Sequence, residues 1–387
     1  MEFSLIQLPD VPKIQIIHLM TMGERIKLAV SSRRMENYLS WMFKNQKIDV
    51  FYSVYLKGDL SRIDIDMGVW ILYISPGMPE YTKSNHITSE ELKPWINEKW
   101  TMIEKTLNVS ERLQNVFPFQ RTNVHVILDE IEPTPILDIL SHPFVQRMMG
   151  VHFYGGTVKR DELDAIMEWR KEDTIQCITL ARNSIPLDYR HPNAFRFSGV
   201  SYGDARWIHL EDLLSIRNML QVFIGEHNFS MSNLNTLIKY WINCEEKMFT
   251  FLDIERKHFN ASELLKDITA LKGFRSEKPF YLVASKSVEK QLLMTIRLFQ
   301  CFADPQRPNR IEFSMQYADK PHRFPSKQTA TAWTREYRIL GRLARKRSLE
   351  KGRITVEEEK ELDDLEEELN AEGVRMIDGI MTVEEEL

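Results

Sequence analysis

The sequence has little cysteine and no long apolar run. Its 387 residues include three cysteines, Cys177, Cys244 and Cys301, which stand far apart and form no CxxC pair. An odd number of widely spaced cysteines argues against both a disulfide framework and a zinc site. Mostly apolar stretches such as 67–74 are far shorter than the roughly 20 residues of a membrane-spanning helix. The start of the chain lacks the pattern of a signal peptide. We therefore expect a soluble intracellular protein, cytoplasmic or nuclear, that does not bind membranes.

Glycine, proline and net charge are also low. With 15 Gly and 16 Pro the chain is neither collagen-like nor a linker, and 20 Phe, 12 Tyr and 8 Trp exclude extensive disorder. The formal net charge is −5, from 51 basic and 56 acidic residues, a balance that does not predict nucleic-acid binding. The length is about twice that of a usual single domain, so two domains are the first expectation.

Motifs of the common catalytic and cofactor sites are absent from the sequence. We find no GxGxxG, GxxxxGK[ST], GxSxG or HExxH pattern, and the ten histidines are scattered. We therefore expect no catalytic residue, no cofactor and no metal, and a protein that is not an enzyme. An enzyme without a known motif stays open as an alternative, with no residue to assign to it.

Three short helices are predicted within the first 45 residues. Thr21 and Glu24 have the spacing of a capping box, and Ser31 or Ser32 caps the third helix. Three such helices bury too little apolar surface to be stable alone, so the module needs a partner surface. Its apolar residues recur at helical spacing: Val11, Ile14, Ile17 and Leu19, then Ile26, Leu28, Ala29 and Val30, then Met35, Tyr38, Leu39 and Met42.

Strand patterns follow, and from about residue 137 they alternate with helices. The first predicted strands are 48–55, 63–66, 69–74 and 124–128, with a helix at 89–107. The later strands are 151–154, 177–180, 195–197, 220–224, 249–252 and 280–283, with helices at 161–171, 210–216, 232–242 and 262–271 between them. Marker residues Phe153, Ile178, Phe197, Val222 and Phe249 are spaced by 25, 19, 25 and 27 residues. This predicts a degenerate strand–helix repeat of leucine-rich-repeat size. The alternative is an ordinary α/β domain with evenly spaced elements.

The end of the chain carries two oppositely charged segments. Eight residues between Arg335 and Arg353 are Lys or Arg, and nine of the twelve from Glu357 to Glu368 are acidic. Both segments are predicted helices that can fold back as a salt-sensitive antiparallel hairpin. Its apolar seam would consist of Leu340, Leu343, Leu362, Leu365 and Leu369. A charged helix that stays extended in solvent, or frays, is the alternative.

Two segments resemble parts of one protein family. The first consists of 3–9, Ile17, Leu19, Met20, Glu24, Ile26, Leu28 and 32–34. It resembles an F-box of the nematode-expanded families and covers about residues 2–42. The second consists of 207–214, 232–235 and 238–242. It resembles the type-2 F-box-associated domain, over roughly 137–260. Both occur in the order that the family has.

The resemblance implies an α/β fold and a function in protein ubiquitination. The expected parts are an F-box at 1–45, a mixed strand and helix region at 46–135, a leucine-rich-repeat-like F-box-associated domain at 136–325, and a charged helical tail at 326–387. Such a chain is the substrate-recognition subunit of a Skp-cullin-F-box ubiquitin ligase. Its partners would be a Skp-family adaptor, through it a cullin, and a target protein. Ubiquitin transfer belongs to other subunits, which agrees with the missing catalytic motifs.

Residues can be predicted for both partner surfaces, the adaptor contacts from the resemblance and the target contacts from the expected strand–helix array, whose side chains alternate outward along each strand. The adaptor-binding residues would be Leu5, Leu8, Pro9, Ile14, Ile17, Leu28 and Met35, whereas we expect Leu19 and Leu39 to pack internally. The target-binding residues would lie at strand ends: His152, Tyr154, Arg196 and Glu226. Two other functions stay open. One is a non-enzymatic interaction scaffold without a ligase role, and the other is a nucleic-acid-associated protein that uses 342–347.

Overall fold

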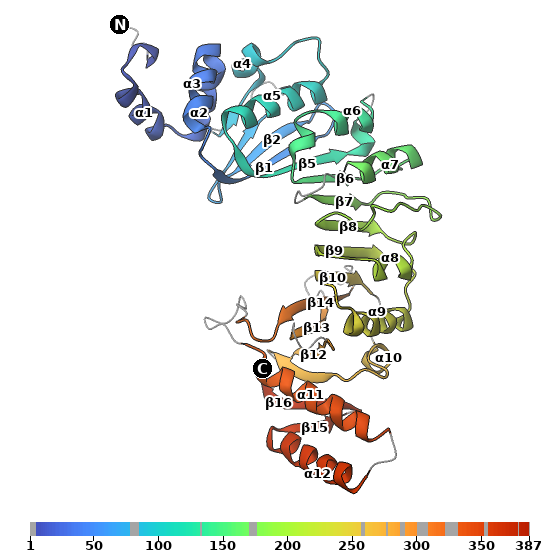
Figure 1. Ribbon diagram of the computed structural model, residues 1–387. Coiled ribbons are helices and arrows are strands. Elements are labelled where there is room, and N and C mark those ends of the chain that lie inside the picture. The colour runs from blue at the N-terminus through green and yellow to red at the C-terminus, as the bar shows by residue number, and fades with distance from the viewer. Residues whose placement is uncertain are drawn as a thin grey trace. The chain divides into compact units, whose positions relative to one another are not determined.

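The chain divides into two units, Met1–Pro186 and Leu187–Leu387 (Figure 1). The division lies inside the region 136–325, which we expected to be one domain. Both units are mixed α/β. Unit 1 begins with three helices, and unit 2 has a helical region near the C-terminus of the chain. The computed structural model describes residues 5–77, 85–131, 134–169, 176–256, 260–275, 278–286, 291–299, 309–321, 332–351, 355–377 and 379–386.

Three helices begin unit 1, as the sequence predicts. They are α1 (Asp10–Leu19), α2 (Met22–Ser31) and α3 (Arg33–Phe43), after a 3-10 turn η1 (Leu5–Gln7). The capping box of α2 is present, with the Thr21 amide donating to Glu24 Oε2 at 2.7 Å. Ser32, rather than Ser31, caps α3, because its hydroxyl accepts from the Met35 amide.

The partner surface that this helical module needs is supplied in part by unit 1 itself. Helices α2 and α3 pack on α4 (Ser89–Leu92), η2 (Lys93–Trp95) and α5 (Met102–Val116). The Phe43 and Phe117 rings lie 5.4 Å apart, and the Ser40 hydroxyl donates to the Asn115 carbonyl at 3.0 Å. The three helices are therefore attached to the sheet-containing body of unit 1 and do not form a free module.

The sheet of unit 1 combines parallel and antiparallel strands. Strands β1, β5, β6 and β7 are parallel, whereas β2 pairs antiparallel with β1 and β3. Helices α5, α6 (Ile136–Ser141) and α7 (Arg160–Glu168) cover one face (Figure 1). On that face Val54, Val124, Val151 and Ile178 lie side by side and are buried. The strand order is β7 (Cys177–Ala181), β6 (Gly150–Tyr154), β5 (Phe119–Ile127), β1 (Ile48–Leu56), β2 (Arg62–Asp66), β3 (Ile71–Ile74) and β4 (His86–Ile87).

Unit 2 begins with three parallel strands, and most of its later strand pairs are antiparallel. Helices α8 (Leu210–Leu214), α9 (Met231–Asn243) and α10 (Ala261–Leu264) belong to it. The strand order is β8 (Gly199–Asp204), β9 (Met219–Glu226), β10 (Phe249–Glu255), β14 (Arg310–Tyr317), β13 (Leu292–Phe299), β12 (Lys278–Ala284), β11 (Leu271–Arg275), β16 (Ile380–Glu386) and β15 (Val374–Ile377). The strand–helix alternation therefore ends at β10, because β11 to β14 form an antiparallel meander with β14 beside β10.

Two predicted elements of unit 2 are wrong. Residues 195–197 are not a strand but part of a turn before β8, in which Phe195 and Phe197 are buried. Phe195 and Phe197 are buried on either side of exposed Arg196. This alternation has the period of a strand, but here a turn produces it. The helix expected at 262–271 is only the short α10, because Leu271 starts β11.

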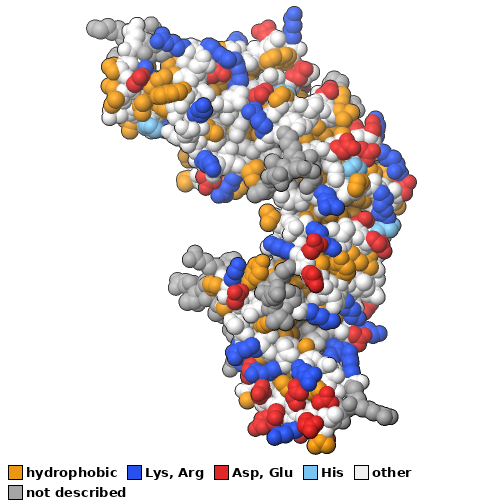
Figure 2. Space-filling view, viewed as in Figure 1, with side chains coloured by type: hydrophobic (Ala, Val, Ile, Leu, Met, Phe, Trp, Pro, Cys, Tyr) orange, Lys and Arg blue, Asp and Glu red, His pale blue; other side chains and the backbone are white. Residues whose placement is uncertain are grey.

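The two charged segments form the antiparallel hairpin. They are α11 (Thr334–Leu349) and α12 (Val356–Ala371), and they are joined by ion pairs such as Arg345–Glu361 and Arg342–Glu368. Basic and acidic side chains intermingle over both helices (Figure 2). The seam differs from the expected one, since Leu362 and Leu365 are only half-buried and the buried leucines face the sheet. Through β16, which pairs parallel with β11, the tail belongs to unit 2.

Candidate protein-interaction site

The face of the unit 1 sheet opposite the helices carries a row of aromatic and polar side chains. Tyr55 of β1, His125 of β5, His152 of β6 and Thr179 of β7 lie directly opposite one another in the strand register. The ring centroids of Tyr55 and His125 are 4.5 Å apart, and those of His125 and His152 are 4.8 Å apart. We call these four residues, with Tyr154, the histidine row.

Hydrogen bonds hold both imidazoles of the histidine row in place. His125 Nδ1 lies 3.2 Å from the Tyr154 hydroxyl, and His152 Nδ1 lies 2.8 Å from the Thr179 hydroxyl. Gly150 makes room beside them, because a Cβ there would lie 2.9 Å from His152 Nε2 and 2.4 Å from Asn123 Oδ1. A side chain at residue 150 would therefore displace the ring of His152.

The histidine row is uncharged near neutral pH. Burial, together with the positive charges of His152 and Arg62, lowers the pKa of His125 to about 3. Burial alone lowers the pKa of His152 to about 4. Both imidazoles are therefore neutral and polar, and with Tyr55 and Tyr154 they offer stacking surfaces and hydrogen bonds rather than charge. Such a surface suits contact with another protein.

The four predicted target-binding residues are divided between the two units. His152 and Tyr154 are both in the histidine row, on β6. Arg196 and Glu226 belong to unit 2. Arg196 is exposed in the turn before β8, and Glu226 ends β9 with its carboxylate 3.8 Å from Arg206. The sequence analysis did not single out Tyr55 and His125, although both alternate with buried residues of β1 and β5.

The predicted adaptor-binding residues are divided between the core and the surface. Ile17 and Met35 are buried inside the helical module, so their assignment to an adaptor interface is wrong. Pro9 is exposed, and the rest are half-buried. They are Leu5, Leu8, Ile14 and Leu28. Leu39 is buried, as expected.

Three apolar side chains that were not predicted as adaptor contacts are exposed in the described part of the helical module. Leu19, which we expected to be packed, is 88% exposed, and Val11 and Trp41 are 68% and 64% exposed. Leu19 is two residues from buried Ile17, and hence on the opposite side of α1. Hydrophobic side chains gather over these helices (Figure 2). The exposed apolar surface of the module thus involves α1 and α3.

General properties of the chain add two findings. Among the described residues, no helix is long and apolar enough to cross a membrane, and no three His, Cys, Asp or Glu side chains are grouped to hold a metal ion. Comparisons of the chain with protein-family models, curated proteins and solved structures find no match. Function must therefore be inferred from the two surfaces described above.

Proposed function

We propose that this chain is the substrate-recognition subunit of a Skp-cullin-F-box type ubiquitin ligase. In this proposal the N-terminal helices are an F-box that binds a Skp-family adaptor, and the adaptor links the chain to a cullin. The observation that carries it is the exposed apolar surface on α1 and α3. Leu19, Val11 and Trp41 are large apolar side chains left in solvent on α1 and α3. In this proposal they belong to one apolar patch, which is a typical feature of interaction surfaces.

The histidine row is the proposed contact for a target protein. In this proposal the target binds the face of strands β5 to β7 that lies opposite the helices, as it would bind the sheet face of a leucine-rich-repeat-like array. The row spans four strands of that face. Aromatic side chains supply large contact areas at low entropic cost, so a neutral Tyr and His surface is a suitable docking face. The ligase then acts by keeping the target close to the conjugating enzyme.

A direct binding measurement tests the adaptor half of this proposal. Purified chain is titrated with a purified Skp-family adaptor by calorimetry. Truncating interface anchors costs about 2 kcal/mol or more, so Leu8→Ala combined with Pro9→Ala should weaken binding at least ~30-fold. Leu19→Ala with Trp41→Ala should weaken it similarly. Leu220→Ala, which truncates an exposed leucine of β9 in unit 2, is the matched control and should bind as the parent does.

The same titration separates the ligase receptor from the scaffold alternative. An interaction scaffold without a ligase role would show no affinity for the adaptor. The F-box assignment also fails if the adaptor binds but both double variants keep the affinity of the parent. Ile17→Ala and Met35→Ala are unsuitable for this purpose, since both residues are buried and their truncation would unfold the module.

A further inference from the structure

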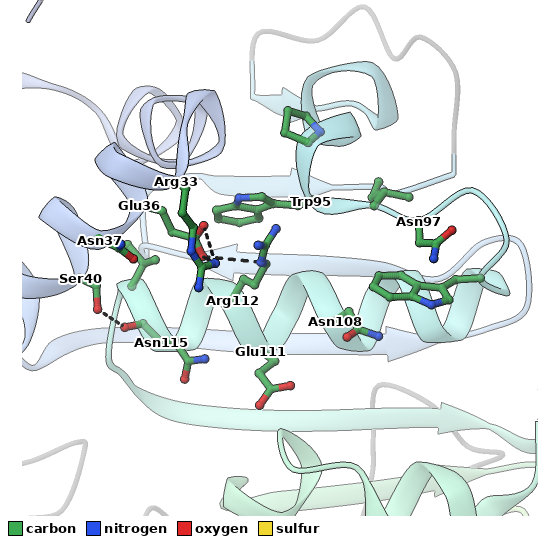
Figure 3. Close-up of a pocket in the computed structure, with 14 residues that line it drawn as sticks. Arg33, Glu36, Asn37, Ser40, Trp95, Asn97, Asn108, Glu111, Arg112 and Asn115 are labelled. Carbon is green, nitrogen blue, oxygen red and sulfur yellow. Dashed lines mark hydrogen bonds and ion pairs between the residues drawn. The ribbon is translucent and has the colours of Figure 1, made fainter. Parts of the chain in front are cut away.

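A polar groove lies between α3, α5 and the segment 94–100 of unit 1. Its volume is about 700 Å³, within the ~300–1,000 Å³ of small-ligand sites. One side is a helical stripe of α3 that includes Asn37 and Ser40, and another is a stripe of α5 that includes Asn108 and Asn115 (Figure 3). Trp95 and Trp100 belong to the third side. We call this site the α3–α5 groove.

The charges of the α3–α5 groove compensate one another. The buried Glu36 carboxylate lies 3.2 Å from Arg33 and 3.6 Å from Arg112, so one acid joins two bases (Figure 3). Glu111 lies 3.4 Å from Arg147. A phosphorylated or strongly acidic ligand would need an unpaired cluster of positive charge, and these pairs do not provide one.

The asparagine side chains keep unused hydrogen-bonding groups. Asn108 donates its amide to the Glu104 carbonyl at 2.8 Å, which leaves its side-chain oxygen as an acceptor. Asn115 accepts from Arg147 at 3.0 Å with its side-chain oxygen, which leaves its NH₂ group as a donor. The side chain of Asn37, in the middle of α3, makes no hydrogen bond to the other described residues and presents both kinds of group. The groove therefore offers donors and acceptors together.

We propose that the α3–α5 groove binds a neutral, extended peptide segment of a partner protein. Asn108 and Asn115 are seven residues apart on α5, which is about 10 Å along the axis at 1.5 Å per residue. Three residues of extended chain also span about 10 Å. Because the N–H and C=O groups on one edge of an extended chain recur at every second residue, a peptide along α5 can donate the N–H of one residue to Asn108 and, two residues on, accept from Asn115 with a C=O. Trp100, which is partly exposed, supplies an apolar contact for one side chain.

A carbohydrate fits the α3–α5 groove less well than a peptide. Sugars stack on open aromatic faces, whereas Trp95 is only 5% exposed and the Arg112 guanidinium lies over its ring at 5.3 Å. The separation of Asn108 and Asn115 along α5 instead matches that of an N–H and a C=O on one edge of an extended peptide. A peptide is therefore the ligand that the groove favours.

The peptide site is separate from the proposed adaptor surface. Asn37 and Ser40 face the α3–α5 groove, whereas Arg34, Tyr38 and Trp41 line a different cavity beside α1. Helix α3 thus presents two independent sides. The peptide site rests on the proposed function in one respect only: the bound peptide is taken to be a segment of the target protein. It holds for a scaffold as well, so the two proposals can fail independently.

Selection from a phage-displayed library of random peptides tests the site. The full chain is the bait, and synthetic copies of enriched peptides are then titrated by fluorescence anisotropy. One hydrogen bond contributes about 1–1.5 kcal/mol, so Asn108→Leu should weaken binding ~10-fold. The matched control is Asn243→Leu on α9, because Asn243 also donates to the carbonyl four residues before it, but in unit 2. Asn243→Leu should bind as the parent does.

A second variant guards against loss of folding. The side chain of Asn37 is exposed and makes no hydrogen bond within the described part of the chain, so Asn37→Ala should leave the fold intact and should still weaken peptide binding. The proposal is overturned if no peptide is enriched, or if enriched peptides bind both groove variants as tightly as the parent. It is also overturned if oligosaccharides on a glycan array, rather than peptides, bind in a manner that depends on Asn108.

Discussion

Replacing Leu369 with alanine tests what holds the C-terminal hairpin on unit 2. Leu369 of α12 is 3% exposed and belongs to one apolar cluster with Leu340 and Leu343 of α11 and Leu271 of β11. Truncating a buried leucine typically costs about 2–5 kcal/mol, because transfer free energy is lost and a cavity is left. Since a whole domain is stable by only about 5–15 kcal/mol, Leu369→Ala should remove a large part of the stability of unit 2.

The ion pair Arg345–Glu361 provides the comparison. Its nitrogen and oxygen lie 2.8 Å apart, but both side chains are largely in solvent, where water and salt screen the attraction. Glu361→Gln should therefore leave stability close to that of the parent. The salt sensitivity expected for an isolated hairpin should also be weak, because α11 and α12 are attached to the sheet through buried leucines.

Urea unfolding of the full chain measures these differences. Trp333 reports on the right region, since it belongs to the same apolar cluster and its indole N–H donates to Gln316 Oε1 at 3.3 Å. Leu369→Ala should move its fluorescence transition to much lower urea, and Glu361→Gln should not. The reasoning is refuted if the two variants lose equal stability, or if molar salt separates fluorophores placed near residues 340 and 366.

Two glycines of unit 2 should respond in opposite ways to alanine. A Cβ at Gly225 would lie 2.2 Å from the Gly203 carbonyl oxygen, where backbone cannot yield, so Gly225→Ala should lower the urea midpoint. Gly341, in the middle of α11 with nothing within 4 Å, should gain up to about 1 kcal/mol as alanine. An unchanged or raised urea midpoint for Gly225→Ala would contradict the expected clash with the Gly203 carbonyl oxygen. In unit 1, the pKa values of His125 and His152 are lowered from 6.5 to about 3 and about 4, so below about pH 6.5 the unfolded chain binds more protons than the folded one. Stability should be full above that pH and fall as pH drops toward 4, and His152→Asn should flatten the decline. If the stability of His152→Asn declined as steeply with falling pH as that of the parent, the predicted contribution of His152 would be wrong.

Local signals in the sequence predict local structure well. The capping box of Thr21 and Glu24 starts a helix where expected, and α12 likewise begins after a capping box of Thr355 and Glu358. A capping box depends only on hydrogen bonds within four residues of the chain, so it does not require a distant contact. The strands around Val124 and Val151 were also predicted, because short runs of β-branched and aromatic residues favour strands.

Partners across the chain could not be predicted from such signals. A stripe of apolar residues indicates that one face of a helix is covered, but it does not show which element covers that face. Met35 was taken for an adaptor contact, yet it is buried in the module, and α3 packs on α5 through contacts such as Ser40 to Asn115, 75 residues away. The pairing of β16 with β11 is equally non-local.

The histidine row depends on the register of the parallel strands. This register corresponds to a fixed spacing between residues along the sequence. Val124 is opposite Val151, and Val151 is opposite Ile178, so the repeat is 27 residues in this part of unit 1. The chosen markers Phe153 and Ile178 differ by 25 and are not opposite each other, since Phe153 pairs with Leu180. With the spacing of 27, His125, His152 and Thr179 fall into one line. A one-residue error in register would turn these side chains to the helix-covered face, so the site follows from the repeat length rather than from any motif.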